Sequence, residues 1–85
     1  MPEICRFMGI VVRMYYREHN PPHVHVSYAG QTAVFRIQDL AVIAGGLPPR
    51  TTGLVAEWIL TRQRELLDDW HRAGNGEPLV PIKPL

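Results

Sequence analysis

The sequence predicts an α+β fold: a small antiparallel sheet of three to four strands, arranged as a meander, with one long C-terminal helix packed on one face. Three observations predict it. Between residues 9 and 46, short segments alternate apolar and polar side chains with a period of two. From Thr51 onward, apolar residues recur every three or four positions. Residues 77–85 then carry a proline at every third position, which predicts an extended Pro-rich tail.

The length of 85 residues predicts a single domain. Within it we expect the sheet in residues 1–46, the helix in 51–73 and the extended tail in 77–85. Hydrophobic residues make up 46% of the chain, which excludes an intrinsically disordered protein. The formal net charge of +1 neither requires nor excludes a nucleic-acid partner. Arginines outnumber carboxylates in residues 1–36, which favours an anionic ligand for that half.

The cysteine content and the absence of apolar segments predict a cytoplasmic location. Cys5 is the only cysteine, so an intramolecular disulfide is excluded and a reducing compartment is favoured. The N-terminus lacks the basic and apolar regions of a signal peptide. No window approaches the ~20 apolar residues of a membrane span. We therefore expect a soluble protein with no membrane partner, which a homodimer or a partner protein would stabilise further.

The strands follow one another along the chain. GIVVRMYYR, residues 9–17, is apolar on both faces and predicts a central strand. HVHVSYAG, residues 23–30, alternates strictly, so that His23 and His25 point away from the core face. TAVFRI predicts a third strand at residues 32–37, and LAVIAG predicts a weaker fourth.

The helix is predicted to begin with Thr51 or Thr52 as its N-cap and to end before Gly74. Its buried stripe consists of apolar residues at helical spacing: Val55, Trp58, Ile59, Leu66 and Trp70. A single helix covers one face of the sheet and leaves the other open. That open face carries histidines and arginines, and we expect the function there.

The segment REHNPPHVHVSY places three of the four histidines within seven positions, around a double proline. One interpretation is a metal site. His23 and His25 project from the same face with Cα atoms roughly 6.5–7 Å apart, close enough to share Zn²⁺ or another divalent metal. His19 would be a third ligand, with Glu18 or Glu3 as an oxygen donor.

A second interpretation is acid/base catalysis. An imidazole that titrates near neutral pH, beside a cation that binds phosphate, is the inventory of a metal-independent ribonuclease. The histidines of the segment would supply the acid and the base, and arginines of the same half would bind the phosphate. A third interpretation is structural, with imidazoles that donate hydrogen bonds to backbone carbonyls around the prolines.

The sequence resembles the bacterial family known as domain of unknown function 4160. The resemblance rests on five segments along the whole chain: MPEICRFMGIVVRMYY, HNPPHVH, GGLPPR, LVAEW and IKPL. HNPPHVH is the most specific of them. The departures are small: Cys5 stands where the family often has serine, and Met8 where it commonly has an aromatic residue. The motif positions carried over, to which the family assigns no role, are His19, Asn20, Pro21, Pro22, His23, His25, Arg13 and Arg50.

The resemblance implies a gene beside that of another small protein, in an arrangement similar to toxin–antitoxin pairs. We therefore expect the chain to bind that small protein through or beside the His/Arg-bearing sheet face, without a cofactor. The anion- or partner-binding residues of this hypothesis are Arg13, Arg17, Arg36, Asn20 and Tyr28. The alternative partner is RNA, with a ribonuclease whose catalytic residues are His23, His25 and His19. In the metal-binding alternative the same three histidines are the ligands.

Overall fold

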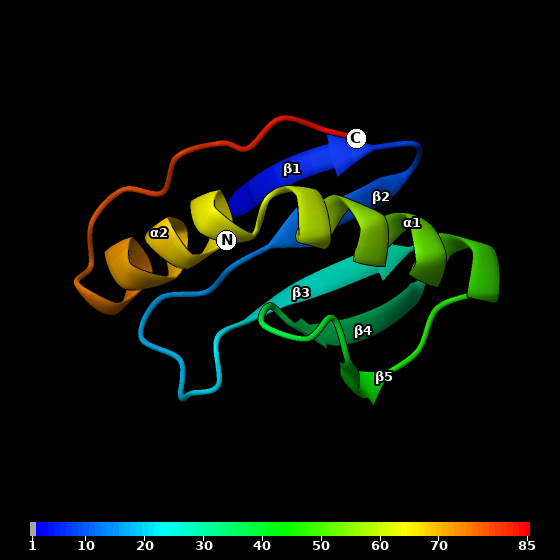
Figure 1. Cartoon of the computed structure of the whole chain (residues 1–85), viewed down its shortest axis with the longest axis horizontal. Coiled ribbons are helices and arrows are strands. Elements are labelled where there is room, and N and C mark those ends of the chain that lie inside the picture. Colours follow the sequence, from blue (N-terminus) through cyan, green and yellow to red (C-terminus); the bar gives the residue numbers. More distant parts are fainter. Residues whose placement is uncertain (1) are drawn as a thin grey trace.

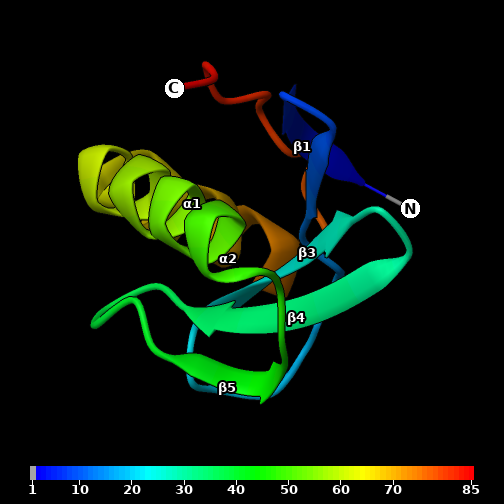
Figure 2. The same cartoon turned by 90° about the vertical axis from the view of Figure 1, so that its right-hand side faces the viewer.

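The computed structural model describes residues 2–85 and has an α+β architecture, as the sequence predicts. Its elements are, in order, β1 (Glu3–Phe7), β2 (Ile10–Arg13), β3 (His23–Tyr28), β4 (Gln31–Arg36), β5 (Val42–Gly45), α1 (Pro49–Thr61) and α2 (Gln63–Gly74). The strands form one antiparallel sheet in the order β1-β2-β3-β4-β5, a meander. Both helices lie on the same side of this sheet, and the opposite side is uncovered (Figures 1 and 2).

The prediction of three to four strands is wrong, because the sheet has five. The strand that sequence reasoning missed is β1, which pairs with β2. Two consecutive residues of β1, Ile4 and Cys5, are both buried, and the register shifts between Glu3 and Cys5. A bulge of this kind destroys the period of two that reveals a strand in the sequence. The turn into β2 is tight, with positive φ at both Met8 and Gly9.

The prediction of one long helix over 51–73 is also wrong, because two helices of about equal length replace it. They are separated at Arg62, whose φ of −116° and ψ of 19° leave the helical region. The helix does not begin with a threonine cap either. It starts at Pro49, where proline is favoured because its missing N–H has no partner in a first turn. Thr52 lies inside that turn and donates its hydroxyl to the carbonyls of Leu47 and Pro48.

The core lies between the sheet and the helices. The predicted stripe is confirmed at four positions, which are fully buried: Val55, Trp58, Ile59 and Leu66. The fifth, Trp70, is only partly buried. From the sheet, the fully buried side chains include Val12, Val24, Val26 and Phe35. No helix within residues 2–85 combines the length and apolar character needed to cross a membrane.

The segment 77–85 runs beside β1, without regular secondary structure (Figure 2). The Ile82 N–H donates to the Ile4 carbonyl at 2.8 Å, and the Trp58 indole N–H donates to the Lys83 carbonyl at 2.8 Å. The fully buried carboxylate of Asp69 accepts the Val80 N–H at 2.9 Å. These bonds attach the segment to the sheet and to both helices.

Candidate functional site

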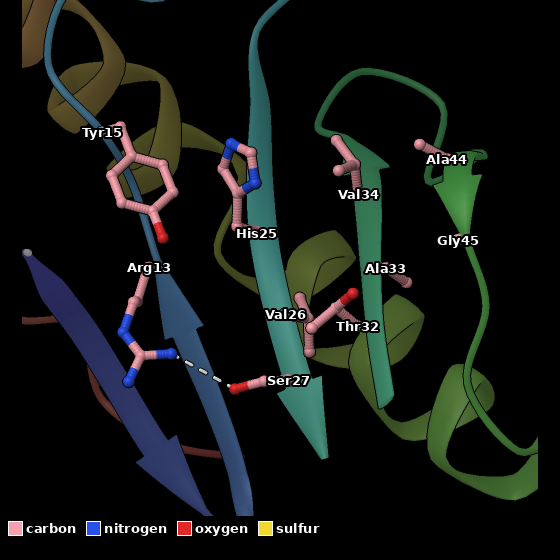
Figure 3. Close-up of a pocket in the computed structure, with 10 residues that line it drawn as sticks. All are labelled: Arg13, Tyr15, His25, Val26, Ser27, Thr32, Ala33, Val34, Ala44 and Gly45. Carbon is pink, nitrogen blue, oxygen red and sulfur yellow. Dashed lines mark hydrogen bonds between the residues drawn. The ribbon is translucent and has the colours of Figure 1, made fainter. Parts of the chain in front are cut away.

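The uncovered face of the sheet carries a shallow hollow of about 240 Å³ (Figure 3). We call this face the open face and define it by the polar and apolar residues that line the hollow: Arg13, Tyr15, His25, Ser27, Thr32, Val34 and Ala44 among others. The strand register places Arg13 opposite His25, and His25 opposite Val34. The alternation of β2 and β3 thus brings a guanidinium and an imidazole together at the centre of the face.

Arg13 is the cation of the hollow. Its Nη1 donates to the Ser27 hydroxyl at 3.2 Å (Figure 3). Glu3 lies opposite Arg13 in the register, but its carboxylate accepts two hydrogen bonds from Arg6, and this pairing lowers the pKa of Glu3. Within residues 2–85, no carboxylate lies within ion-pair distance of Arg13. Arg13 contributes to lowering the pKa of Glu3 through space, but it forms no ion pair among these residues, and its guanidinium remains open to a ligand on the open face.

A second group of polar side chains lies at the N-terminal end of β3. The carboxylate of Glu18 faces both neighbouring imidazoles: Oε1 is 2.8 Å from Nε2 of His25 and 3.2 Å from Nε2 of His23. One ligating atom from each of the three residues lies within 4.8 Å of the others. We call these three residues the Glu18 cluster. Glu18 reaches β3 because the preceding residue, Arg17, has a positive φ of 55° and turns the chain.

The two histidines of the cluster have different surroundings. His23 is only 9% exposed, so the expectation that it lies on an open surface is wrong. Its ring packs against that of Trp70 from α2, with ring centroids 5.1 Å apart, and its Nδ1 lies 2.7 Å from the Pro21 carbonyl. His25 is more exposed and lines the hollow, where its ring meets the edge of Tyr15 at a centroid distance of 4.5 Å.

The structure does not bring the third histidine into this group. His19 and its neighbour Asn20 are exposed in the loop before β3, and the cluster of ligating groups contains Glu18 in place of His19. As a metal ligand set, the combination of His23, His25 and His19 is therefore replaced by two histidines and a carboxylate. Glu18 is one of the two oxygen donors that the sequence predicts, and spacing does not decide between it and Glu3 because the position of Glu18 depends on the conformation of the loop.

The other predicted binding residues are dispersed. Arg36 is engaged by Asp39, to which its guanidinium donates two hydrogen bonds of 2.8 and 2.9 Å. Arg17 lies near the end of α2, where its guanidinium occupies the space that a side chain at Gly76 would need. Tyr28 sits at the far end of β3 and packs against the core, beside a separate hollow that Arg50 also lines. Of the predicted arginines, only Arg13 shares the hollow with His25.

This geometry limits the chemistry. An acid/base pair of His23 and His25 acting on a ligand in the hollow requires that both rings line it, but only His25 does. The open face therefore offers one imidazole, one guanidinium and a phenol from Tyr15, and the Glu18 cluster offers two nitrogen donors and a carboxylate.

Comparison with known proteins identifies the family. Residues 9–71 match the sequence model of the family described as "Domain of unknown function (DUF4160)". The matched range contains the open face, the Glu18 cluster and most of both helices. No curated protein and no solved structure matches the chain. Because the match covers well over half of the sequence, the chain belongs to the DUF4160 family.

Proposed function

We propose that the chain is a cytoplasmic binding module of a toxin–antitoxin-like pair and that it holds a small partner protein, encoded by the adjacent gene, on the open face of its sheet. The observation that supports this most is the charge of Arg13, which lies in a hollow on the uncovered face and has no carboxylate within ion-pair distance among residues 2–85.

An acidic side chain of the partner fits this hollow. A guanidinium binds a carboxylate with two parallel hydrogen bonds, and such charge-assisted bonds are stronger than neutral ones. Ser27 already orients the guanidinium, and the ring of His25 borders the same space. Arg36 takes no part in this proposal, because Asp39 satisfies its charge.

Beside the hollow, β5 offers the apolar contact area that a protein partner requires. All four of its residues are exposed, including the large side chains of Val42 and Ile43. The hollow reaches β5 at Ala44 and Gly45, so polar and apolar surface are continuous. The exposed apolar side chains beside the charged anchor favour a polypeptide over a small anion, because a protein interface buries apolar area that a small anion cannot supply.

The test is the affinity for the adjacent gene product. Arg13→Ala should weaken binding about 10- to 100-fold, because it removes a central charged anchor. Arg64→Ala is the matched control, since Arg64 is exposed on α2, away from the open face. Calorimetric titration of the purified proteins measures both. Equal affinity of the two variants, or no complex with the wild type, would refute the proposal.

RNA cleavage is the second candidate, favoured by the proximity of Arg13, Tyr15 and His25 in one hollow. In this hypothesis His25 is the one histidine that acts as general acid or base in the cleavage, and Arg13 binds the phosphate. Expression of the chain without its neighbour should then arrest growth, and His25→Ala should abolish the arrest. His71→Ala, at an exposed position of α2, should leave it unchanged. Growth that continues with the wild type, or arrest that persists in His25→Ala, argues against the ribonuclease.

A further inference from the structure

We propose that the Glu18 cluster is a binding site for one divalent transition-metal ion of the Zn²⁺ type. Glu18, His23 and His25 contribute one carboxylate and two imidazole nitrogens, with one ligating atom of each within 4.8 Å of the other two. The site shares His25 with the hollow but does not include Arg13, so metal binding and partner binding can be tested by different substitutions.

The hydrogen bond of His23 supports the proposal. The Pro21 carbonyl can only accept a hydrogen bond, so Nδ1 of His23, 2.7 Å away, must carry a proton. In a neutral imidazole the other nitrogen, Nε2, then presents a lone pair. That lone pair points toward the carboxylate of Glu18 at 3.2 Å. A lone pair and a carboxylate oxygen repel each other unless a cation or a second proton lies between them.

The same requirement arises at His25. Its Nε2 lies 2.8 and 3.1 Å from the two carboxylate oxygens of Glu18. One bound cation satisfies both nitrogens and the carboxylate at once.

The distances between the ligand atoms suit a small ion if the Glu18 cluster expands slightly. Ligand atoms about 2.0–2.1 Å from a tetrahedral ion lie roughly 3.4 Å from one another. The separations from Oε1 of Glu18, 2.8 Å to His25 and 3.2 Å to His23, fall a few tenths of an ångström short of this. The side chains of Glu18 and His25 are 27% and 29% exposed, so rotation of either side chain can open the site.

The surroundings of the cluster also resemble those of metal sites. A metal-bound histidine commonly donates its other N–H to a backbone carbonyl, which fixes the ring, and Pro21 provides this carbonyl for His23. Trp70 shields the same ring on its other side. Nitrogen donors favour Zn²⁺ over Mg²⁺ or Ca²⁺, which prefer oxygen. Three protein ligands leave a fourth position for water or a substrate, as in catalytic zinc sites.

The experiment is a metal titration of the full chain, purified without a histidine tag and stripped with a chelator. We expect one Zn²⁺ per chain by calorimetry and a tetrahedral absorption spectrum with Co²⁺. Glu18→Gln, which keeps the shape of the side chain, should weaken Zn²⁺ binding by at least about 10- to 100-fold. His19→Gln is the matched control, because His19 is adjacent in sequence, exposed and outside the cluster.

A second readout locates the ion. Trp70 lies beside His23, with ring centroids 5.1 Å apart, so bound Co²⁺ should quench its fluorescence, and Trp70→Phe should remove most of that quenching. The proposal is overturned if the wild type binds no Zn²⁺ and NMR finds protons on Nε2 of both cluster histidines. It is equally overturned if Glu18→Gln, shown by circular dichroism to be folded, binds Zn²⁺ as tightly as His19→Gln does.

Discussion

The two edges of the sheet differ in what covers them. At the β1 edge, the 77–85 segment donates the Ile82 N–H to Ile4 and places the Ile82 side chain in the core, where it is 5% exposed. β5 forms the other edge of the sheet (Figure 1). All four of its residues are exposed, and Ile43 is 42% exposed. Two isoleucines of the same protein therefore lie in opposite environments, one at each edge.

This difference indicates where another chain can bind. An uncovered edge strand presents unpaired backbone N–H and C=O groups, which are a template for pairing with a further strand. The chain itself covers the β1 edge and leaves the β5 edge free among residues 2–85. The free edge also adjoins the hollow of the open face through Ala44 and Gly45. Covering one edge limits association to the other, which is consistent with a single docking surface.

The largest expected effect comes from replacing the isoleucine at each edge by alanine. Ile82→Ala should lower the free energy of unfolding by about 2–4 kcal/mol, because it leaves a cavity in the core. Ile43→Ala should lower it by less than about 1 kcal/mol, because the side chain is already half in water. Equilibrium unfolding in urea measures both. Equal losses would show that the 77–85 segment does not contribute to the core as described.

The sheet illustrates how far the sequence predicts the fold. The alternation of apolar residues in HVHVSY and TAVFR predicted β3 and β4 closely, because both strands are regular and have one buried face. Alternation failed at β1, where the bulge buries Ile4 and Cys5 together. The break between the helices left no signal either, because Arg62 and Gln63 are good helix formers. Gln63 instead donates its side-chain amide to the Ile37 carbonyl, a tertiary contact at 2.9 Å.

Prediction of the candidate site from the sequence has the same limit: it succeeds in regular strands and fails in loops. The period of two placed Arg13 and His25 on one face correctly, because both lie in regular strands. It did not decide between Glu18 and Glu3 as the oxygen donor beside the histidines, because the contact of Glu18 depends on a loop conformation with positive φ at Arg17. The ion pair between Arg36 and Asp39 could have been predicted from the sequence, because Asp39 follows Arg36 at a spacing typical of local ion pairs.

The rate of amide hydrogen exchange should also differ between the two edges, and we expect this effect to be smaller than the difference in unfolding free energy. The Ile82 amide is bonded to Ile4, so it should exchange at least about tenfold more slowly than the outward-facing amides of β5. Exchange of individual amides, followed by NMR, provides the measurement, and the amides between β3 and β4 serve as the protected reference. If the β5 amides are as slow as that of Ile82, something covers the second edge in solution, and a homodimer through β5 is the first explanation to test.

The smallest effect concerns the ion pair near each edge. Arg6 lowers the pKa of Glu3 in β1, and Arg36 lowers the pKa of Asp39 in the turn before β5. Because both folded-state pKa values are depressed, each pair stabilises the fold above the unfolded pKa, and the contribution is lost as the pH falls from the unfolded value through the folded one. Both pairs are exposed, so the change in overall stability should be slight.

The two pairs nevertheless differ in what they hold in place. Asp39 also accepts the Ala41 N–H at 3.2 Å, whereas Arg6 is the one donor to the Glu3 carboxylate among the residues that the structure describes. Acidification should therefore speed exchange of the Ala41 amide, relative to the intrinsic rate at each pH, and leave the Ile82 amide protected. Asp39→Asn should raise Ala41 exchange at neutral pH, and Glu3→Gln should not. If both substitutions leave the Ala41 amide unchanged, the turn before β5 is held by the backbone bonds Arg36–Ala41 and Leu40–Arg36 alone.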